Sequence, residues 1–586
     1  MEYKKLVDLY ALIVGTTKRL EKTYLVSQFL KATDIDDIPK IVLLLQGKVF
    51  TTIDERKLGV AARIVIKALN KSVGMTDDNI EKEWKKTGDL GITAENLVGK
   101  KKQVTLFSKD LSVSKVFSNI AKLADLEGSG TVDRKVALIS ELLTSATPQE
   151  ARYIIRTVLE DLRVGIGEGV LRDSIVWAFF EDSIHINYDA EKKSITPENR
   201  ELYNVYTEAV QEAYDVLNDF SEVAKIAKVS GLKGLKSLNI VVGKPLKVML
   251  YQKVRDIAEA FERVGKPAAL EYKYDGFRMQ IHKSNKKIRI FTRRLEEVTD
   301  QFPEVVEFVK KHVDADSFIL DGEAVGFDVK TKKYLAFQSI SQRIKRKYDI
   351  EKLSKEFPVE LNIFDIISFE GETLLKKPFK ERRKIIERIV KGAPYSIVTS
   401  KQIVTSDAAE AEKFYKASLA AGNEGIMVKN LDGVYKPGSR VGYGVKVKPV
   451  MESLDLVVVG AEWGEGKRSG WFTSFTLACY DPDSGSFLEI GRVGTGIKEK
   501  VEMGVSFEQL TELLKPLITS EKGRSVFVKP ALVVEVNFEE IQKSPTYSSG
   551  YALRFPRVIR IREDRSPDEA SDLALVEELY STQRSR

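Results

Sequence analysis

The hydrophobic pattern of this 586-residue chain changes twice, and each change limits the fold. Up to about residue 240, apolar residues recur at helical spacing, and Thr147, Pro148 and Glu150 form a capping box before one such run. Gly243 and Pro245 then interrupt the pattern, after which apolar and polar residues alternate as in β-strands. Beyond residue 449 the strands are short and separated by turns. The sequence therefore predicts three regions that are built differently.

These patterns predict a multidomain protein with an all-α region at 1–240, an α/β (α+β) region at 241–449 and an all-β region at 450–586. The length allows roughly three or four domains of about 150 residues. Short strands joined by turns favour a small barrel such as an OB-fold in the last region. The tail returns to a C-terminal helix, because Ser566, Pro567 and Glu569 form a second capping box before an apolar stripe.

Composition narrows the class of protein. Cys479 is the single cysteine, so an intrachain disulfide is impossible, and the three histidines do not pair with it as a structural zinc site. The net charge of +7 permits a polyanionic partner without requiring one. The amino terminus lacks an apolar signal core, and no run of about eighteen apolar residues occurs. We expect a cytoplasmic protein without a membrane segment.

The segment EYKYDGFR (271–278) carries the strongest chemical signal. If it is extended, Glu271, Lys273 and Asp275 share one face, while Tyr272 and Tyr274 take the other. The polar face would line a pocket. Lysine normally titrates near ~10.4, so a nucleophilic lysine needs nearby cations, a metal or desolvation. The alternative is a hairpin with a solvated lysine and a turn at Asp-Gly.

Further motifs follow in order: SFILDGEAV (317–325), NIFDII (362–367), EGIMVK (424–429), VKVK (445–448) and RFPRVIRIRED (554–564). This series resembles the nucleotidyltransferase motifs of ATP-dependent DNA ligases. The whole chain resembles the archaeal replicative type, which is related to the eukaryotic DNA ligase I family. The resemblance implies a helical DNA-binding domain, an adenylation (nucleotidyltransferase) domain and an OB-fold domain within the three predicted limits.

The resemblance also assigns roles to residues. Lys273 would form a phosphoramide with AMP, Glu271 would recognise adenine, and Phe364 would stack on the base. Glu323 would bind the ribose hydroxyls and, with Glu424, hold Mg²⁺, with Mn²⁺ as the alternative. Positive charge around ATP would come from Arg278, Arg293, Arg440 and Lys446, and phosphate contacts from Lys429, Lys448, Arg554 and Arg557.

Each assignment has a simpler alternative. Phe364 fits a strand residue packed in a core, beside apolar Ile363 and Ile366. The sequence around Glu323 would more often be a turn with a solvated acid. Any one of the cations, taken alone, would more often lie in solvent. Their place in an ordered series of motifs favours the functional assignment.

The N-terminal region carries two predicted contacts. Glycine-containing turns at 87–91, 126–130 and 163–169 would let backbone amides approach phosphates, although glycine more often ends a helix. The peptide QVTLF, with Gln103, Leu106 and Phe107, resembles the motif that docks on the sliding clamp PCNA. It would equally fit the start of a helix or part of a core.

We therefore predict an ATP-dependent DNA ligase that seals 5′-phosphate/3′-hydroxyl nicks in duplex DNA through a lysyl-AMP intermediate. Replication, repair and recombination would use this activity, and we expect a monomer. The alternatives are an RNA capping guanylyltransferase or RNA ligase, and a non-catalytic DNA-binding or clamp-associated protein. About 240 helical residues ahead of Lys273 argue against the former, and the intact set of motif residues argues against the latter. NAD-dependent ligases are disfavoured because they normally carry a four-cysteine zinc site.

Overall fold

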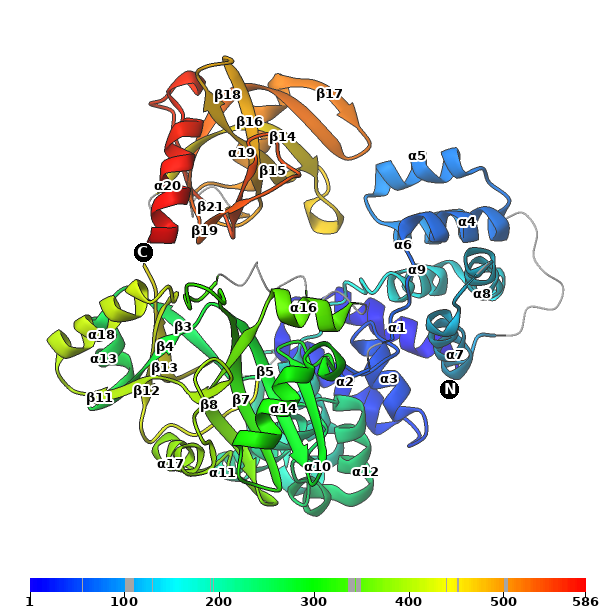
Figure 1. The fold of residues 1–586 in the computed structure, drawn as a ribbon. Helices are drawn as coiled ribbons and strands as arrows, with labels where there is room; N and C mark the ends of the chain where they lie inside the picture. Colours follow the sequence, from blue (N-terminus) through cyan, green and yellow to red (C-terminus); the bar gives the residue numbers. More distant parts are fainter. Residues whose placement is uncertain are drawn as a thin grey trace.

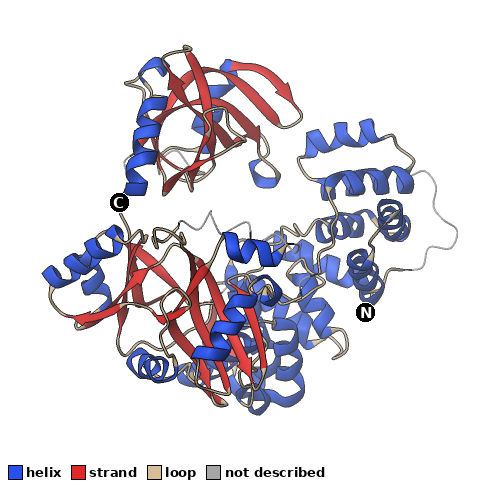
Figure 2. Ribbon diagram, viewed as in Figure 1, coloured by secondary structure: helices blue, strands red, loops and turns tan. Residues whose placement is uncertain are grey.

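The computed structural model describes residues 1–54, 56–100, 110–128, 130–189, 191–192, 194–335, 343, 349–438, 440–449, 453–499 and 504–585. Three regions follow one another along the chain: helices, then two β-sheets with flanking helices, then a β-rich region that ends in a helix (Figures 1 and 2). The predicted clamp peptide at 103–107 lies outside the described residues. The multidomain class predicted from the patterning is confirmed.

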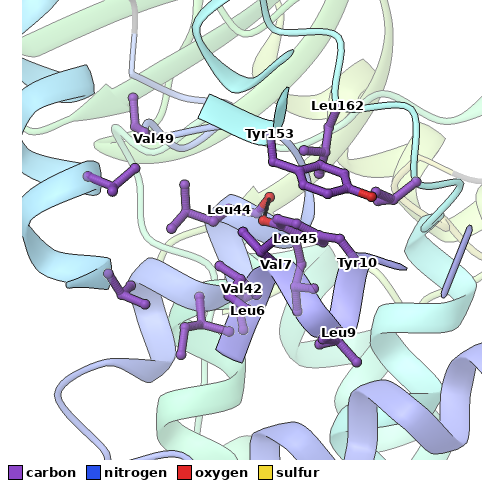
Figure 3. Packing of buried hydrophobic residues seen from close by; sticks show 14 of the residues in the cluster. Leu6, Val7, Leu9, Tyr10, Val42, Leu44, Leu45, Val49, Tyr153 and Leu162 are labelled. Carbon is purple, nitrogen blue, oxygen red and sulfur yellow. Dashed lines mark hydrogen bonds between the residues drawn. The ribbon is translucent and has the colours of Figure 1, made fainter. Parts of the chain in front are cut away.

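The first region is a helical assembly around one hydrophobic core, part of which Figure 3 shows. In that core Tyr10 and Tyr153 pack with ring centroids 4.8 Å apart, and the Tyr10 hydroxyl donates to the Leu44 carbonyl oxygen at 2.9 Å. Its helices are α1 (Tyr3–Val14), α2 (Arg19–Lys31), α3 (Ile38–Leu45), α4 (Ala62–Val73), α5 (Asp77–Thr87), α6 (Leu90–Gly99), α7 (Val113–Lys122), α8 (Thr131–Ser145), α9 (Pro148–Val158), α10 (Glu168–Ile184), α11 (Arg200–Leu217) and α12 (Phe220–Lys236).

The capping box predicted before α9 is present. The Glu150 amide donates to Thr147 Oγ1 at 3.3 Å, and the Thr147 amide donates to Glu150 Oε2 at 2.8 Å. A cap of this kind contributes about 1 kcal/mol to helix stability. One element was not anticipated: a hairpin of β1 (Ile186–Asp189) and β2 (Ser194–Pro197) follows α10. It forms because His185 ends α10 in the left-handed conformation and Tyr188 then stacks on Tyr24 at 4.1 Å.

The second region contains two sheets. Strands of the first run in the order β11 (Gln402–Thr405), β4 (Ala268–Lys273), β12 (Gly425–Asn430), β13 (Arg440–Val447) and β3 (Leu250–Val254). Strands of the second run in the order β10 (Ile397–Thr399), β8 (Val359–Phe369), β7 (Ser317–Gly326), β5 (Phe277–Ser284) and β6 (Lys287–Thr292), with β9 (Glu372–Thr373) beside β8. Its helices are α13 (Ile257–Val264), α14 (Pro303–His312), α16 (Ile350–Glu356), α17 (Phe379–Ile389) and α18 (Ala408–Ala420).

The third region is a β-structure with one long helix, which lies at the top of Figure 1. Its main sheet has the order β16 (Ser486–Val493), β15 (Phe472–Asp481), β14 (Leu454–Trp463), β18 (Ser525–Asn537) and β17 (Ile518–Lys522), with β21 (Arg557–Ile561) also paired to β18. A hairpin of β19 (Glu540–Lys543) and β20 (Tyr551–Arg554) and the helices α19 (Phe507–Leu514) and α20 (Leu573–Ser585) complete it.

The final helix begins later than its capping box. The box formed by Ser566 and Glu569 closes a short 3₁₀ turn, and the chain then becomes extended at Ala570. α20 starts at Leu573 and buries Val576 completely against the barrel. The predicted apolar stripe is therefore correct, while the predicted start is wrong, because the extended residue separates the cap from the helix.

Ion pairs join the three regions. Arg163 of the helical region bonds Glu465 of the third region at 2.8 Å, and Lys376 of the second region bonds Glu212 of α11 at 2.8 Å. Region ends are clear, since α12 stops at Lys236 and β13 stops at Val447. We keep 1–240, 241–449 and 450–586 as the proposed domain limits. Within the described residues, no helix is long and apolar enough to cross a membrane.

Candidate active site

A cavity of about 520 Å³ lies where the two sheets of the second region meet, and Figure 1 shows β4, β12 and β13 beside β7 and β8 there. The third region adds Arg554 to its wall. Predicted site residues that line it are Glu271, Lys273, Arg278, Arg293, Glu323, Phe364, Glu424, Lys429, Lys446 and Arg554. The fold therefore brings together residues that are up to 283 positions apart, from 271 to 554.

The lysine motif does not form a hairpin. β4 ends at Lys273 and β5 begins at Phe277, but the two strands belong to different sheets, so the turn between them crosses from one wall to the other. Tyr272 packs in the core at 4.8 Å from the Phe414 ring. A Cβ at Gly276 would lie 2.5 Å from the Ala324 carbonyl oxygen, so this crossing requires glycine.

Lys273 lies at the charged end of the cavity. Its Nζ is 2.5 Å from Glu424 Oε2, and Lys448 Nζ is 2.6 Å from the same oxygen. Burial opposes ionisation of Glu424, but Lys273 and Lys448 outweigh it and lower its pKa to about 2. Glu424 is therefore an anion that two lysines share. We call Lys273, Glu424, Lys446 and Lys448 the lysine cluster.

Positive charge exceeds negative charge in this cluster. Burial lowers the pKa of Lys446, and the neighbouring cations Lys448 and Lys273 lower it further. Lys448 is also desolvated, yet its ion pair with Glu424 holds its pKa above the ordinary value. Glu539 of the third region approaches Lys448 at 3.6 Å. A site with three lysines around one central carboxylate is suited to a polyanion such as a polyphosphate.

Glu323 is the second carboxylate at this end. It lies on β7 opposite Arg278 of β5, and burial raises its pKa to about 8, although Lys273 and Arg278 act in the other direction. A desolvated carboxylate of this kind loses its proton readily beside a divalent cation. Within the described residues, no group of three or more His, Cys, Asp or Glu side chains gathers as a metal site. Two carboxylates fit Mg²⁺ when phosphate oxygens and waters complete its octahedron.

The other end of the cavity is built around Glu271, which is 1% exposed. Lys429 Nζ lies 2.5 Å from Glu271 Oε2, and the Lys429 ammonium also lies 5.1 Å from the centroid of the Phe364 ring. Lys429 thus shares its surroundings with Glu271 and Phe364 rather than with Lys273 and Glu424. Lys429 also lines the cavity, so its predicted phosphate contact stays a prediction. We call Glu271, Phe364 and Lys429 the base end.

Arg278 is held firmly in the wall between the two ends. Its guanidinium donates to both carboxylate oxygens of Asp321, at 2.9 and 2.6 Å, and the Tyr435 hydroxyl donates to the same carboxylate at 2.9 Å. Despite burial, Asp321 keeps the pKa of Arg278 above its ordinary value. The guanidinium carbon is 5.2 Å from the Phe364 ring centroid. Arg278 is therefore a fixed cation next to the predicted stacking ring.

The remaining predicted residues differ in their placement. Arg293 is exposed at the cavity rim. Arg440 begins β13 opposite Leu250, and its side chain lies outside the described part of the structure. Arg554 bonds Glu540 at 3.0 Å and reaches the cavity. Arg557 begins β21, is exposed, and is not among the described residues that line the cavity.

Sequence reasoning missed several residues of the base end. Met427 lines the cavity, and Arg383 of α17 and Gln402 of β11 bond Glu271. A signal for Arg383 was present: Arg382 and Arg383 lie at i+3 and i+4 from Phe379, on the face that buries this helix. Basic residues on an apolar face need buried partners, which points to a network beneath the site.

Comparison with known proteins places this architecture in a class. Three consecutive family models match: DNA ligase N terminus at 2–176, ATP dependent DNA ligase domain at 248–448, and ATP dependent DNA ligase C terminal region at 468–565. A solved structure described as Pmar-Lig_Pre. has a TM-score of 0.56 at 17% identity, over 95% of this chain and 99% of that chain, which shows a shared fold.

Proteins with similar sequences identify the family of this chain more closely. A DNA ligase of Nanoarchaeum equitans is 48% identical over 586 residues, which cover 100% of this chain and 99% of the relative. A DNA ligase of Archaeoglobus fulgidus is 42% identical over 96% of each chain. The chain belongs to the family of ATP-dependent DNA ligases. Its three regions are the ligase N-terminal domain, the adenylation domain and the C-terminal OB-fold domain.

Proposed function

We propose that this ligase seals 5′-phosphate/3′-hydroxyl nicks in duplex DNA with ATP, through a covalent AMP adduct on Lys273. The observation that carries the proposal is the lysine cluster: Lys273 Nζ lies 2.5 Å from Glu424 in a cavity with surplus positive charge. Family membership supports ATP-driven joining of DNA, and the cavity supports Lys273 as the nucleophile.

The chemistry has three transfers. Lys273 first gives up its ammonium proton, the resulting amine attacks the α-phosphorus of ATP and loses a second proton as the P–N bond forms, and pyrophosphate leaves as its P–O bond breaks. A 5′-phosphate oxygen of the nick then attacks the same phosphorus, and the P–N bond breaks to release the lysine, which regains both protons. Finally the 3′-hydroxyl attacks the 5′-phosphorus, its proton departs, and AMP leaves.

Residues of the lysine cluster support these transfers electrostatically. Lys446 and Lys448 would neutralise charge on the transferring phosphate, and Arg554 of the OB-fold domain would contact the departing pyrophosphate. Glu323 and Glu424 would hold a divalent cation, Mg²⁺ with Mn²⁺ as the alternative, which supplies further charge neutralisation when bound. Glu271 and Phe364 would bind the adenine base, and Arg278 with Arg293 would flank the nucleotide.

The other domains would hold DNA and a partner. The helical domain would grip duplex DNA through phosphate contacts, and the peptide with Gln103, Leu106 and Phe107 would dock on the sliding clamp PCNA. We further propose a cytoplasmic monomer that serves replication, repair and recombination. Phe107→Ala should leave clamp-independent sealing unchanged and remove stimulation by the clamp. Stimulation that survives this change would place the docking site elsewhere.

The decisive experiment incubates the protein with α-labelled ATP and the metal, and then adds nicked duplex DNA. We expect a labelled adduct that disappears as the nick is sealed. Lys273→Ala should abolish the adduct, while Lys286→Ala, at an exposed turn of the same domain, should not. A full adduct on the Lys273→Ala protein would assign the nucleophile to another residue, and an adduct that nicked DNA cannot discharge would contradict ligation.

A further inference from the structure

Two adjacent arginines of α17 reach the two walls of the base end. Arg382 binds both carboxylate oxygens of Asp365, at 2.7 and 3.0 Å, and Asp365 follows Phe364 on β8. Arg383 donates to Glu271 Oε1 at 3.4 Å and to the Ser400 carbonyl oxygen at 2.9 Å. Arg382 is 1% exposed and Arg383 is 7% exposed. One buried helix therefore spans the strand of the stacking ring and the strand of the predicted base-recognising carboxylate.

A second donor reaches Glu271 from the neighbouring strand. Gln402 of β11 lies directly opposite Glu271 of β4, and its Nε2 donates to Glu271 Oε1 at 2.8 Å. Met427 of β12 lies opposite Glu271 on the other side and lines the cavity. Neither Gln402 nor Arg383 is among the described residues that line the cavity. Both act on the site through Glu271.

These contacts fix the carboxylate in one orientation. Gln402 and Arg383 bind Oε1, while Lys429 binds Oε2 at 2.5 Å, so rotation of the group would break donors on both oxygens. A carboxylate has about four acceptor positions, so acceptor capacity remains for a ligand in the cavity. Breaking a buried charge-assisted hydrogen bond is costly, which makes this orientation stable.

We propose that Gln402 and Arg383 are positioning residues that hold Glu271 as a hydrogen-bond acceptor toward the base and thereby set selectivity for adenine. An ionised carboxylate accepts only, so it suits the 6-amino group of adenine and repels the 6-carbonyl oxygen of guanine. Arg383, Gln402 and Lys429 all donate to the Glu271 carboxylate, so both of its oxygens act as acceptors. The inference rests on the proposed adenylation at Lys273.

The test measures the rate of adduct formation on the full-length protein with three nucleotides. These are ATP, GTP and purine riboside triphosphate, which lacks the 6-amino group. For Gln402→Ala and Arg383→Lys we expect the preference for ATP over purine riboside triphosphate to fall about tenfold, through a higher KM for ATP. Nick sealing by protein that already carries AMP should keep its rate, because the base is then covalently retained.

Matched controls separate positioning from general damage. Gln252→Ala removes an amide from β3 at the far edge of the same sheet, and Arg388→Lys alters an exposed arginine of α17. Both should keep the ATP preference. If Gln402→Ala and Arg383→Lys also keep it while their melting temperatures stay near that of the parent, the inference is wrong. If the parent protein forms no adduct at all, the proposed function is wrong. This result differs from an unchanged ATP preference in the variants, which contradicts only the inference.

Discussion

The two ends of the cavity use charge in opposite ways. At the base end, Glu271 is bonded by Lys429, Arg383 and Gln402, so its charge is balanced before any ligand binds. In the lysine cluster, by contrast, three lysines surround Glu424, and the pKa of Lys446 is lowered by burial and by its cationic neighbours. The charges at the base end are therefore balanced in the free protein, whereas the lysine cluster has excess positive charge that an anion would neutralise.

This difference fits the proposed division between base recognition at one end and phosphate chemistry at the other. A balanced, buried network keeps its geometry and can distinguish two bases by their hydrogen-bonding groups. Cations without a full set of anionic partners are stabilised most when a phosphate binds beside them. They therefore favour both binding of the nucleotide and the transfer step. Both ends draw on β12 and the residue before it, since Lys429 lies near one end of this strand and Glu424 precedes the other. Substitutions at the two ends should therefore produce different losses.

The largest expected effect is at the lysine cluster. Glu424→Gln removes the carboxylate that Lys273 and Lys448 share, and with it a proposed metal ligand. Adduct formation should slow by about 100-fold or more, and the metal concentration for half-maximal rate should rise. Single-turnover labelling across a magnesium titration measures both quantities. A rate within a factor of about two of the parent would remove Glu424 from the chemistry.

A pair of lysine substitutions compares the two ends directly. Lys429→Met leaves buried Glu271 without its closest partner and should lower the free energy of unfolding by about 3 kcal/mol. Lys448→Met should cost only about 1 kcal/mol, because Lys273 still pairs with Glu424, yet it should slow adduct formation at least tenfold. Denaturant unfolding and labelling of both proteins provide the test. Equal losses of stability in the two variants would contradict the proposed difference in charge balance between the two ends.

Two arginines within the last motif allow a finer comparison. Arg554 lines the cavity, whereas Arg557 is exposed at the start of β21. Arg554→Ala should slow adduct formation about tenfold through loss of a phosphate contact. Arg557→Ala should stay within about twofold of the parent in this arrangement of the domains. A larger effect for Arg557→Ala would indicate that the OB-fold domain moves during the first step.

The smallest effect concerns pH. Burial raises the pKa of Glu323 to about 8, above the unfolded value near 4.3, so the folded protein holds this proton more tightly. Its contribution to stability is full below about pH 4 and is lost as pH rises toward and through 8. Glu323→Gln should therefore gain in melting temperature relative to the parent from pH 6 to pH 9, by about 2–4 °C.

The same titration should appear in metal binding. Protons and a divalent cation compete for Glu323, so the metal concentration for half-maximal adduct formation should fall as pH rises from 7 to 9. Glu323→Gln should lose this dependence. If the difference in melting temperature between the parent and the variant is the same at every pH, and both show the same metal dependence, Glu323 does not titrate in this range.

Local pattern was enough to predict much of the fold. The capping box at Thr147, the change near residue 240 and the turn-separated strands after 449 each depend on neighbouring residues. The strands after 449 are longer than predicted, however, since β14 and β15 have 10 residues each and β18 has 13. Errors appeared where a distant contact or one backbone angle decided the outcome. The β1–β2 hairpin forms where Tyr188 stacks on the distant Tyr24. The helix α20 starts later than predicted because Ala570 is extended. Neither signal is visible in the adjacent sequence.

The sequence by itself determined that Glu271 and Lys273 share one face, because they lie two residues apart along β4. Only the tertiary structure decided which partner each charged side chain binds. It pairs Lys429 with Glu271, shares Glu424 between Lys273 and Lys448, and brings Arg383 and Gln402 beneath the base end. Ion pairing depends on distance and burial, which arise only when strands and helices far apart in the chain pack together.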